Sequence, residues 1–290
     1  MGAGMQIEPI QMTQTTAFGA TVSGVDLNRL RDDEWAVIEA AWYEHAVLVF
    51  PNQHVEEPAH VALGERIGDL EEFVADRKSV PISNRKVDGS AVDPNSDHLQ
   101  ILKGNEGWHT DSTYMPLSAR ASILAAQVVP AEGGQTEWAD MRAAYDVLDD
   151  ETRDQIADLA AYHSLFYSQA KVGHNPAVGA SYGLSDQDIP LRPLVKVHPI
   201  TQRPALFIGR HAHGIPGLSE AESEALLERL TTFACQSPRV FAHTWEPGDV
   251  VMWDNRCVLH RARPYDYAKP RVMRHVRVAG DPVTEAGITA

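Results

Sequence analysis

Three side chains have types and a spacing that could hold one redox-active metal ion. His109 and Asp111 are two residues apart, and His260 lies far away in the segment 253–260. Residues two apart on an extended chain point to the same side, so His109 and Asp111 could bind an ion together while His260 completes the set from another strand. Two imidazoles and one carboxylate that leave positions open are the ligand set of non-haem Fe(II) oxygenases. Such a site could bind oxygen and a substrate.

Arg271 makes this interpretation more specific. It follows His260 by 11 residues (271 − 260 = 11). A guanidinium group is a rigid fork that suits one end of a dicarboxylate whose other end chelates a metal. The sequence therefore predicts 2-oxoglutarate as a cosubstrate beside O2. Zinc would fit the same three ligands, so the ligand set alone leaves iron and zinc open.

Short blocks of sequence, spread over nearly the whole chain, carry a resemblance. They are GVDL (24–27), LVFP (48–51), WHTDSTY (108–114), GGQTEW (133–138), WDNR (253–256) with His260, and Arg271. In this order they resemble the taurine and 2,4-dichlorophenoxyacetate dioxygenases, which depend on Fe(II) and 2-oxoglutarate. The likeness is strongest to the phenoxypropionate (aryloxyalkanoate) dioxygenases of the S-selective type, in the blocks 108–116, DMRAAYD (140–146), LRPLVKVHP (191–199) and IGRHAH (208–213). Several concordant blocks are far more specific than any one of them.

The resemblance implies a reaction and the residues that support it. Fe(II) would be held by His109, Asp111 and His260, and Thr136 would join Arg271 in fixing 2-oxoglutarate. An enzyme of this kind hydroxylates an anionic substrate, here an aryloxyalkanoate such as (S)-phenoxypropionate. Hydroxylation at the carbon that bears the ether oxygen gives a hemiketal, which collapses to a phenol and a 2-oxo acid. The alternatives are a sulfonate or alkyl sulfate dioxygenase of the same family and a metal-binding cupin that is not an oxygenase.

Position 275 departs from the taurine-type pattern, in which a second arginine four residues after the first binds the anionic group of the substrate. This chain has His275 there. On a regular strand His275 would share a face with Arg271 and Arg277, while Arg274 would point away. The candidate residues for the substrate are therefore Tyr114, Arg210, His211, His275 and Arg277.

The composition bounds the class of protein. Hydrophobic residues at 43% and charged residues at 22% are typical of a globular protein with a sizeable core. A net charge of −15 disfavours nucleic acid and anionic membranes as partners. The two cysteines are far apart in sequence, and no segment looks like a signal peptide or a membrane span. We expect a cytoplasmic, homo-oligomeric enzyme that acts on a small carboxylate.

Hydrophobic periodicity and turn residues predict the elements that position these side chains. Helices are expected over 32–45, 58–67, 141–148, 150–159 and 219–234, and strands over 46–50, 82–84, 122–128, 136–139, 239–245, 250–254 and 271–278. Strands joined by tight turns indicate a barrel or sandwich with helices outside. The resemblance implies a mainly β protein with flanking helices, whose core is a double-stranded β-helix of the jelly-roll or cupin type. No repeat or linker divides the chain, so we expect one domain over 1–290, with 72–107 as a lid-like loop region.

Overall fold

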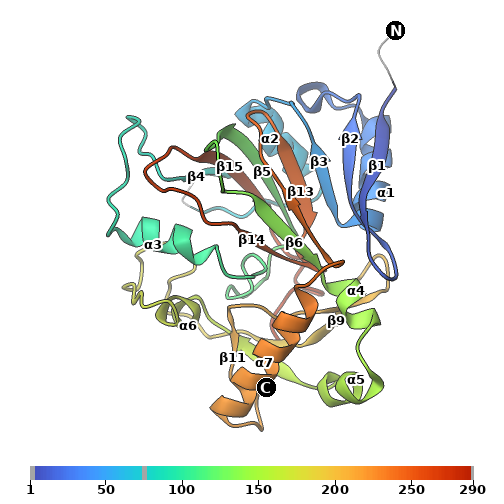
Figure 1. Cartoon of the computed structure of the whole chain (residues 1–290), viewed down its shortest axis with the longest axis vertical. Helices are drawn as coiled ribbons and strands as arrows, with labels where there is room; N and C mark the ends of the chain where they lie inside the picture. Colours follow the sequence, from blue (N-terminus) through green and yellow to red (C-terminus); the bar gives the residue numbers. More distant parts are fainter. Residues whose placement is uncertain (1–3, 74–76, 289–290) are drawn as a thin grey trace.

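Two facing sheets form the centre of the molecule. The computed structural model describes residues 4–73 and 77–288. The larger sheet has the order β1-β2-β3-β13-β5-β15-β4, and a smaller sheet has the order β12-β6-β14 (Figure 1). The strands of the larger sheet are β1 (Gln6–Met12), β2 (Ala17–Ser23), β3 (Val47–Phe50), β13 (Val250–Asp254), β5 (Ala121–Val128), β15 (Val272–Val278) and β4 (Ser79–Ser83). Those of the smaller sheet are β12 (Val240–His243), β6 (Thr136–Asp140) and β14 (Val258–Ala262).

Side chains that alternate along the central strands explain why the larger sheet has different neighbours on its two faces. In β3, Leu48 and Phe50 belong to a hydrophobic cluster with the helices α1 (Asp32–His45) and α2 (Glu57–Glu65). Val47 and Val49 point the other way, into a cluster with the smaller sheet. The predicted core, a double-stranded β-helix with helices packed outside, is confirmed.

The remaining elements cover one end of this core. Two small sheets, β11-β7-β8 and β10-β9, lie there with the helices α4, α5 and α7, which gather in the lower part of Figure 1. The strands are β7 (Ala160–His163), β8 (Leu191–Pro193), β9 (Val195–Val197), β10 (Pro204–Leu206) and β11 (Ala212–His213). The helices are α4 (Met141–Asp146), α5 (Asp150–Ile156), α6 (Leu165–Ala170) and α7 (Glu220–Ala234). None of the helices in the described ranges has the length and apolar character needed to cross a bilayer.

The segment predicted as a lid-like loop region, 72–107, contains more regular structure than its composition indicates. The strand predicted at 82–84 is present but earlier, as β4, and the helix α3 (Asp97–Gly104) was not predicted. Ser96 caps α3, because its side chain accepts a hydrogen bond from the Leu99 amide. Residues 74–76 of the segment lie outside the described residues.

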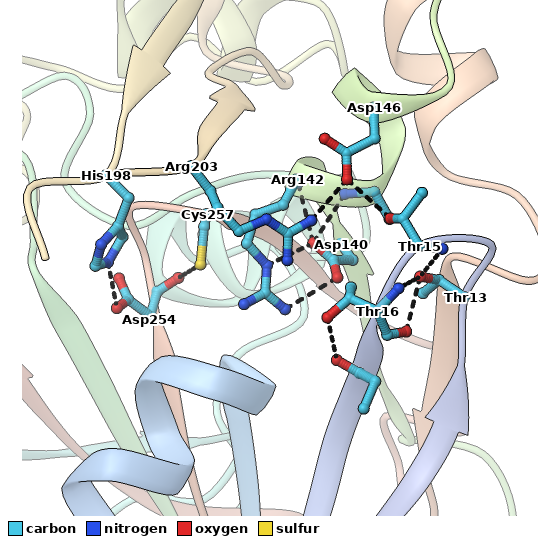
Figure 2. A network of polar contacts seen from close by, with 12 residues as sticks. Thr13, Thr15, Thr16, Asp140, Arg142, Asp146, His198, Arg203, Asp254 and Cys257 are labelled. Atoms are coloured by element: carbon cyan, nitrogen blue, oxygen red, sulfur yellow. Dashed lines mark hydrogen bonds and ion pairs between the residues drawn. The ribbon is translucent and has the colours of Figure 1, made fainter. Parts of the chain in front are cut away.

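Two aspartate–arginine pairs are buried where strands of the two sheets end. Figure 2 shows Asp140 beside Arg142, and Asp254 beside His198. Arg142 donates from Nε to Asp140 Oδ1 at 2.9 Å and from Nη2 to Oδ2 at 3.0 Å. Arg256 donates from Nε to Asp254 Oδ1 at 2.8 Å, and His198 Nε2 lies 3.0 Å from Oδ2 of the same carboxylate. Arg142 also donates from Nη1 to the Glu44 carbonyl oxygen at 3.0 Å, so its pair connects β6 with the end of α1.

Candidate active site

His109, Asp111 and His260 meet at one point inside the molecule. Each offers a ligand atom, these atoms lie within 4.8 Å of one another, and all three residues are buried. The chain at His109 pairs with β14, because His109 N donates to His260 O at 2.9 Å and His260 N donates to His109 O at 2.8 Å. This pairing sets the two rings side by side, with centroids 4.1 Å apart. Residues 151 positions apart in sequence (260 − 109 = 151) are thus brought together by strand pairing.

The three side chains present suitable donor atoms to a metal ion. His109 Nδ1 lies 2.8 Å from the Gly107 carbonyl oxygen, which leaves Nε2 free to coordinate. Burial lowers the pKa of His109 to about 3 and that of His260 to about 4, so both rings stay neutral and keep a lone pair. Burial alone would raise the pKa of Asp111, but the charge of Arg277 brings it well below its usual range. Two neutral imidazoles and one carboxylate fit a divalent ion with open positions.

A cavity of 390 Å³ opens beside this triad. Arg271 and Thr136, the residues predicted to bind 2-oxoglutarate, both line it. Arg271 Nη2 donates to the Gly134 carbonyl oxygen at 3.2 Å, and its Nε is buried without a partner among the described residues. Thr136 Oγ1 accepts a hydrogen bond from Trp245 Nε1 at 2.9 Å, which leaves the hydroxyl hydrogen free to donate. Together they offer several donors to one carboxylate.

The two glycines before Thr136 allow the chain to pass close to Arg271. Gly133 and Gly134 have φ angles of 73° and 68°, in the left-handed region that favours glycine. A Cβ atom on Gly134 would lie 3.3 Å from Arg271 Nε, and one on Gly133 would lie 2.5 Å from the Pro264 carbonyl oxygen. The close approach of the chain to Pro264 and Arg271 therefore explains why residues 133 and 134 are glycines.

The predicted face of β15 is confirmed. Arg271, His275 and Arg277 all line the cavity. Arg274 points away and pairs with Glu57 Oε1 at 2.8 Å on the surface. His275 packs against Trp253 with ring centroids 6.0 Å apart, and its Nε2 lies 3.9 Å from Asp111 Oδ2.

The other candidate substrate residues also line the cavity. His211 stands next to the triad, since its ring centroid is 5.9 Å from that of His109 and 5.0 Å from that of Tyr114. Its Nδ1 lies 2.8 Å from Ser168 Oγ, so Nε2 is the nitrogen left for a ligand. Arg210 lines the same cavity, with Nη2 donating to the Ser168 carbonyl oxygen at 2.9 Å and Nη1 to the Gly104 carbonyl oxygen.

Arg277 has partners within the protein. It donates from Nη2 to Asp111 Oδ1 at 3.0 Å and from Nη1 to Ser112 Oγ at 2.8 Å, and Nη1 is 3.4 Å from Glu71 Oε2. Ser122 Oγ donates to Asp111 Oδ2 at 2.6 Å. Neither Glu71 nor Ser122 was among the predicted site residues. Glu71 lies in an acidic stretch that looks like surface, and Ser122 looks like an ordinary strand residue. No pattern in the sequence distinguishes either.

Apolar side chains form a separate part of the cavity wall. They come from β4, α3, β5 and α6 and include Val80, Ile82, Ile101, Leu102, Leu124 and Leu165. The cavity thus combines the triad, an arginine and a threonine with free hydrogen-bond donors, a second polar cluster and an apolar wall. A double-stranded β-helix with these groups in one cavity is typical of an oxygenase that depends on iron and 2-oxoglutarate.

Comparison with known proteins agrees with this class. Residues 6–279 match the family described as "Taurine catabolism dioxygenase TauD, TfdA family". The chain belongs to this family and is a 2-oxoglutarate-dependent non-haem iron dioxygenase. Membership in an oxygenase family also removes the support for a non-oxygenase cupin.

Three relatives cover almost the whole chain. An (S)-phenoxypropionate/alpha-ketoglutarate-dioxygenase of Sphingobium herbicidovorans is 50% identical over an alignment of 294 positions, which covers 99% of each chain. One of the same name from Delftia acidovorans is 51% identical over 284 residues, with 95% of this chain and 97% of the relative covered. The crystal structure of AAD-2 in complex with Mn(II) and N-oxalylglycine superposes with a TM-score of 0.89 at 37% identity, covering 99% of this chain and 100% of that one.

Proposed function

We propose that this enzyme hydroxylates aryloxyalkanoates, with (S)-phenoxypropionate as the representative substrate. The observation that carries the proposal is the divided lining of the cavity, in which a polar cluster and an apolar wall both lie beside the triad. An aryloxypropionate has a carboxylate for the first part and an aromatic ring for the second. Two relatives that span nearly the whole chain carry that substrate in their names.

His109, Asp111 and His260 would hold Fe(II), and Arg271 with Thr136 would bind the distal carboxylate of 2-oxoglutarate. With 2-oxoglutarate and O2, the bound iron supplies the oxidant for hydroxylation of a substrate C–H bond, and succinate and CO2 are released. The donors on Arg271 and Thr136 orient the cosubstrate by charge-assisted hydrogen bonds. The neutral imidazoles and the ionised Asp111 keep the metal ligands in the protonation state that coordination needs.

The substrate carboxylate would bind to His211, Tyr114 and Arg210. Within residues 4–73 and 77–288, His211 Nε2 has no hydrogen-bond partner, and the His211 ring lies beside that of His109. A carboxylate held there would place the adjacent carbon near the triad, and the aryl group would extend toward the apolar wall. Hydroxylation of the carbon that bears the ether oxygen then gives a hemiketal, which collapses to a phenol and a 2-oxo acid.

A panel of substrates scored by succinate release tests this proposal. The panel contains (R)- and (S)-phenoxypropionate, phenoxyacetate, taurine and an alkyl sulfate. We expect kcat/KM for (S)-phenoxypropionate to exceed that for taurine by roughly 100-fold, because taurine leaves the apolar wall unfilled. Faster turnover of taurine or of the alkyl sulfate would instead support the sulfonate or sulfate ester alternative.

Four further predictions stay part of this proposal. The chain would form one domain over 1–290, and the segment 72–107 would act as a lid. The lid is supported by Ile101 and Leu102 of α3, which lie in the cavity wall.

The protein would be cytoplasmic, consistent with the free Cys235 and Cys257. It would be a homo-oligomer, which light scattering after size-exclusion chromatography would measure.

A further inference from the structure

A chain of polar contacts leads from the metal-ligand candidate Asp111 to two other parts of the fold. Arg277 on β15 bridges Asp111 and Ser112 on one side and Glu71 on the other. Ser112 Oγ donates to Glu71 Oε2 at 2.8 Å, and Tyr182 OH donates to the same oxygen at 2.9 Å. All of these residues except Tyr182 are buried. The contacts therefore form one network that ends on a metal ligand.

This network separates the two oxygens of Asp111. Arg277 occupies Oδ1 at 3.0 Å. Oδ2 faces the triad, since it lies 3.6 Å from His260 Nε2, and it accepts a hydrogen bond from Ser122 at 2.6 Å. A carboxylate fixed at both oxygens cannot rotate freely about its Cβ–Cγ bond. Asp111 is therefore held with one particular oxygen toward the imidazoles.

Glu71 balances the charge of Arg277. A lone guanidinium beside a metal site would repel a dication and would compete with it for the charge of Asp111. Here two carboxylates, Glu71 and Asp111, share one guanidinium. Burial raises the pKa of Glu71, and Arg277 with the hydrogen bonds from Ser112 and Tyr182 acts against that shift. With Glu71 ionised, the three groups retain one negative charge for a cation. Because the groups are buried, these interactions are screened less than on a surface.

The third donor to Glu71 comes from the segment between α6 and β8. The Tyr182 ring packs against Phe73 with centroids 5.0 Å apart, and the Arg277 guanidinium lies over Phe73 at 4.8 Å. Gly183 follows with a φ of 80°, and a Cβ there would lie 2.1 Å from the Tyr114 ring. The segment is thus fitted closely to the cavity rim, and Tyr182 connects it to the network.

We propose that Glu71 and Arg277 are positioning residues that act through Asp111, and that Tyr182 supports them. Arg277 fixes which oxygen of Asp111 meets the metal, and Glu71 neutralises Arg277 so that Asp111 keeps its charge for the ion. This assignment gives Arg277 a different role from substrate-anion binding. It rests on the proposed role of the triad as metal ligands.

The test measures metal affinity without turnover. Mn(II), a redox-stable probe, is titrated anaerobically into the full-length protein without 2-oxoglutarate, and free Mn(II) is followed by electron paramagnetic resonance. We expect Glu71→Gln to raise the Kd for Mn(II) about 10- to 100-fold, the range found when outer-shell partners of metal ligands are changed. Tyr182→Phe removes one hydrogen bond to Glu71 and should raise the Kd a few-fold.

A matched pair elsewhere provides the control. Tyr167 OH donates to Glu224 Oε1 at 2.8 Å, so Glu224→Gln and Tyr167→Phe make the same chemical changes in a pair not connected to Asp111. Both should leave the Kd for Mn(II) unchanged. Equal affinities in Glu71→Gln, Tyr182→Phe and the wild type would overturn the proposal. If Glu71→Gln does not fold, an unchanged Kd in Tyr182→Phe and Ser112→Ala would do so.

Two further variants separate this proposal from its rivals. Asp111→Ala should abolish Mn(II) binding; if it does not, the triad assignment itself fails, whatever Glu71→Gln shows. Arg277→Lys should raise the Kd for Mn(II) in the absence of substrate. A raised KM for the aryloxyalkanoate with an unchanged Kd for Mn(II) would instead make Arg277 a substrate-binding residue.

Discussion

Two buried clusters of charged side chains in this protein are built from similar groups and differ in what they leave unpaired. The first comprises the pairs Asp140–Arg142 and Asp254–Arg256 with His198; Figure 2 shows Asp140, Arg142, Asp254 and His198 of this cluster. In that cluster each carboxylate faces its own guanidinium, and none of these side chains has an unpartnered buried polar atom within the described ranges. Buried charges that are fully paired in this way hold elements together and offer nothing to a ligand.

The second cluster surrounds Asp111 and remains open. Unpartnered buried nitrogens occur there among the described residues, namely His260 Nδ1, Arg271 Nε, His275 Nε2 and Arg277 Nε. Leaving such groups unpaired costs about 1–3 kcal/mol each, so a fold that tolerates several of them in one cavity is organised for binding rather than for stability. Burial and charge are common to both clusters, so they do not by themselves mark a functional site. Incomplete pairing around a cavity does.

The largest expected effect is a loss of stability from a substitution in the first cluster. Asp254→Asn leaves the buried guanidinium of Arg256 without its counter-charge, and we expect the free energy of unfolding to fall by about 3–5 kcal/mol. Urea denaturation followed by circular dichroism measures this loss. The matched change Asp111→Asn should cost less stability, because Arg277 keeps Glu71 as a partner. Equal losses in the two variants would contradict the contrast between the clusters.

Arg271→Ala tests the open cluster at the proposed cosubstrate end. We expect the KM for 2-oxoglutarate to rise about 100-fold, because charged hydrogen bonds to one carboxylate are lost, while the KM for the aryloxyalkanoate changes far less. Steady-state succinate release at varied 2-oxoglutarate measures both constants. Arg274→Ala is the control, since Arg274 lies three residues along the chain and faces the surface. A rise confined to the organic substrate would refute the assignment of Arg271.

His211→Ala should have the smallest effect of the three. We expect the KM for the aryloxyalkanoate to rise about 10-fold, as for the loss of one charge-assisted hydrogen bond, with the KM for 2-oxoglutarate nearly unchanged. His213→Ala serves as the control, because His213 stacks on Tyr167 with ring centroids 4.4 Å apart and does not line the cavity. Unchanged kinetics in His211→Ala would move the substrate anion toward His275.

Much of the fold could be predicted because its information is local. Residues 32–45 form α1 with the predicted bounds, since acidic residues begin the helix and apolar residues recur at helical spacing. The apolar run ending at Pro51 forms β3, and the alternating pattern of 271–278 forms β15 with the predicted inward face. Strands with weaker patterns were not predicted, as with β1 and β14. The strand β14 forms because it pairs with β6 and with the chain at His109. Pairing with distant segments leaves no hydrophobic periodicity in the sequence.

The ligand types, the order of the blocks and the glycines that let the chain pass close to Arg271 could all be identified from the residues alone. The place of Glu71, Ser122 and Tyr182 around Asp111 follows instead from how separate elements pack in the folded chain. The physical reason is that a motif is a matter of spacing along the chain, whereas a hydrogen bond between residues 71 and 182 is a matter of packing between separate elements. Glu71 lies in an acidic stretch, which predicts a solvated carboxylate. In the folded chain it is buried beside Arg277.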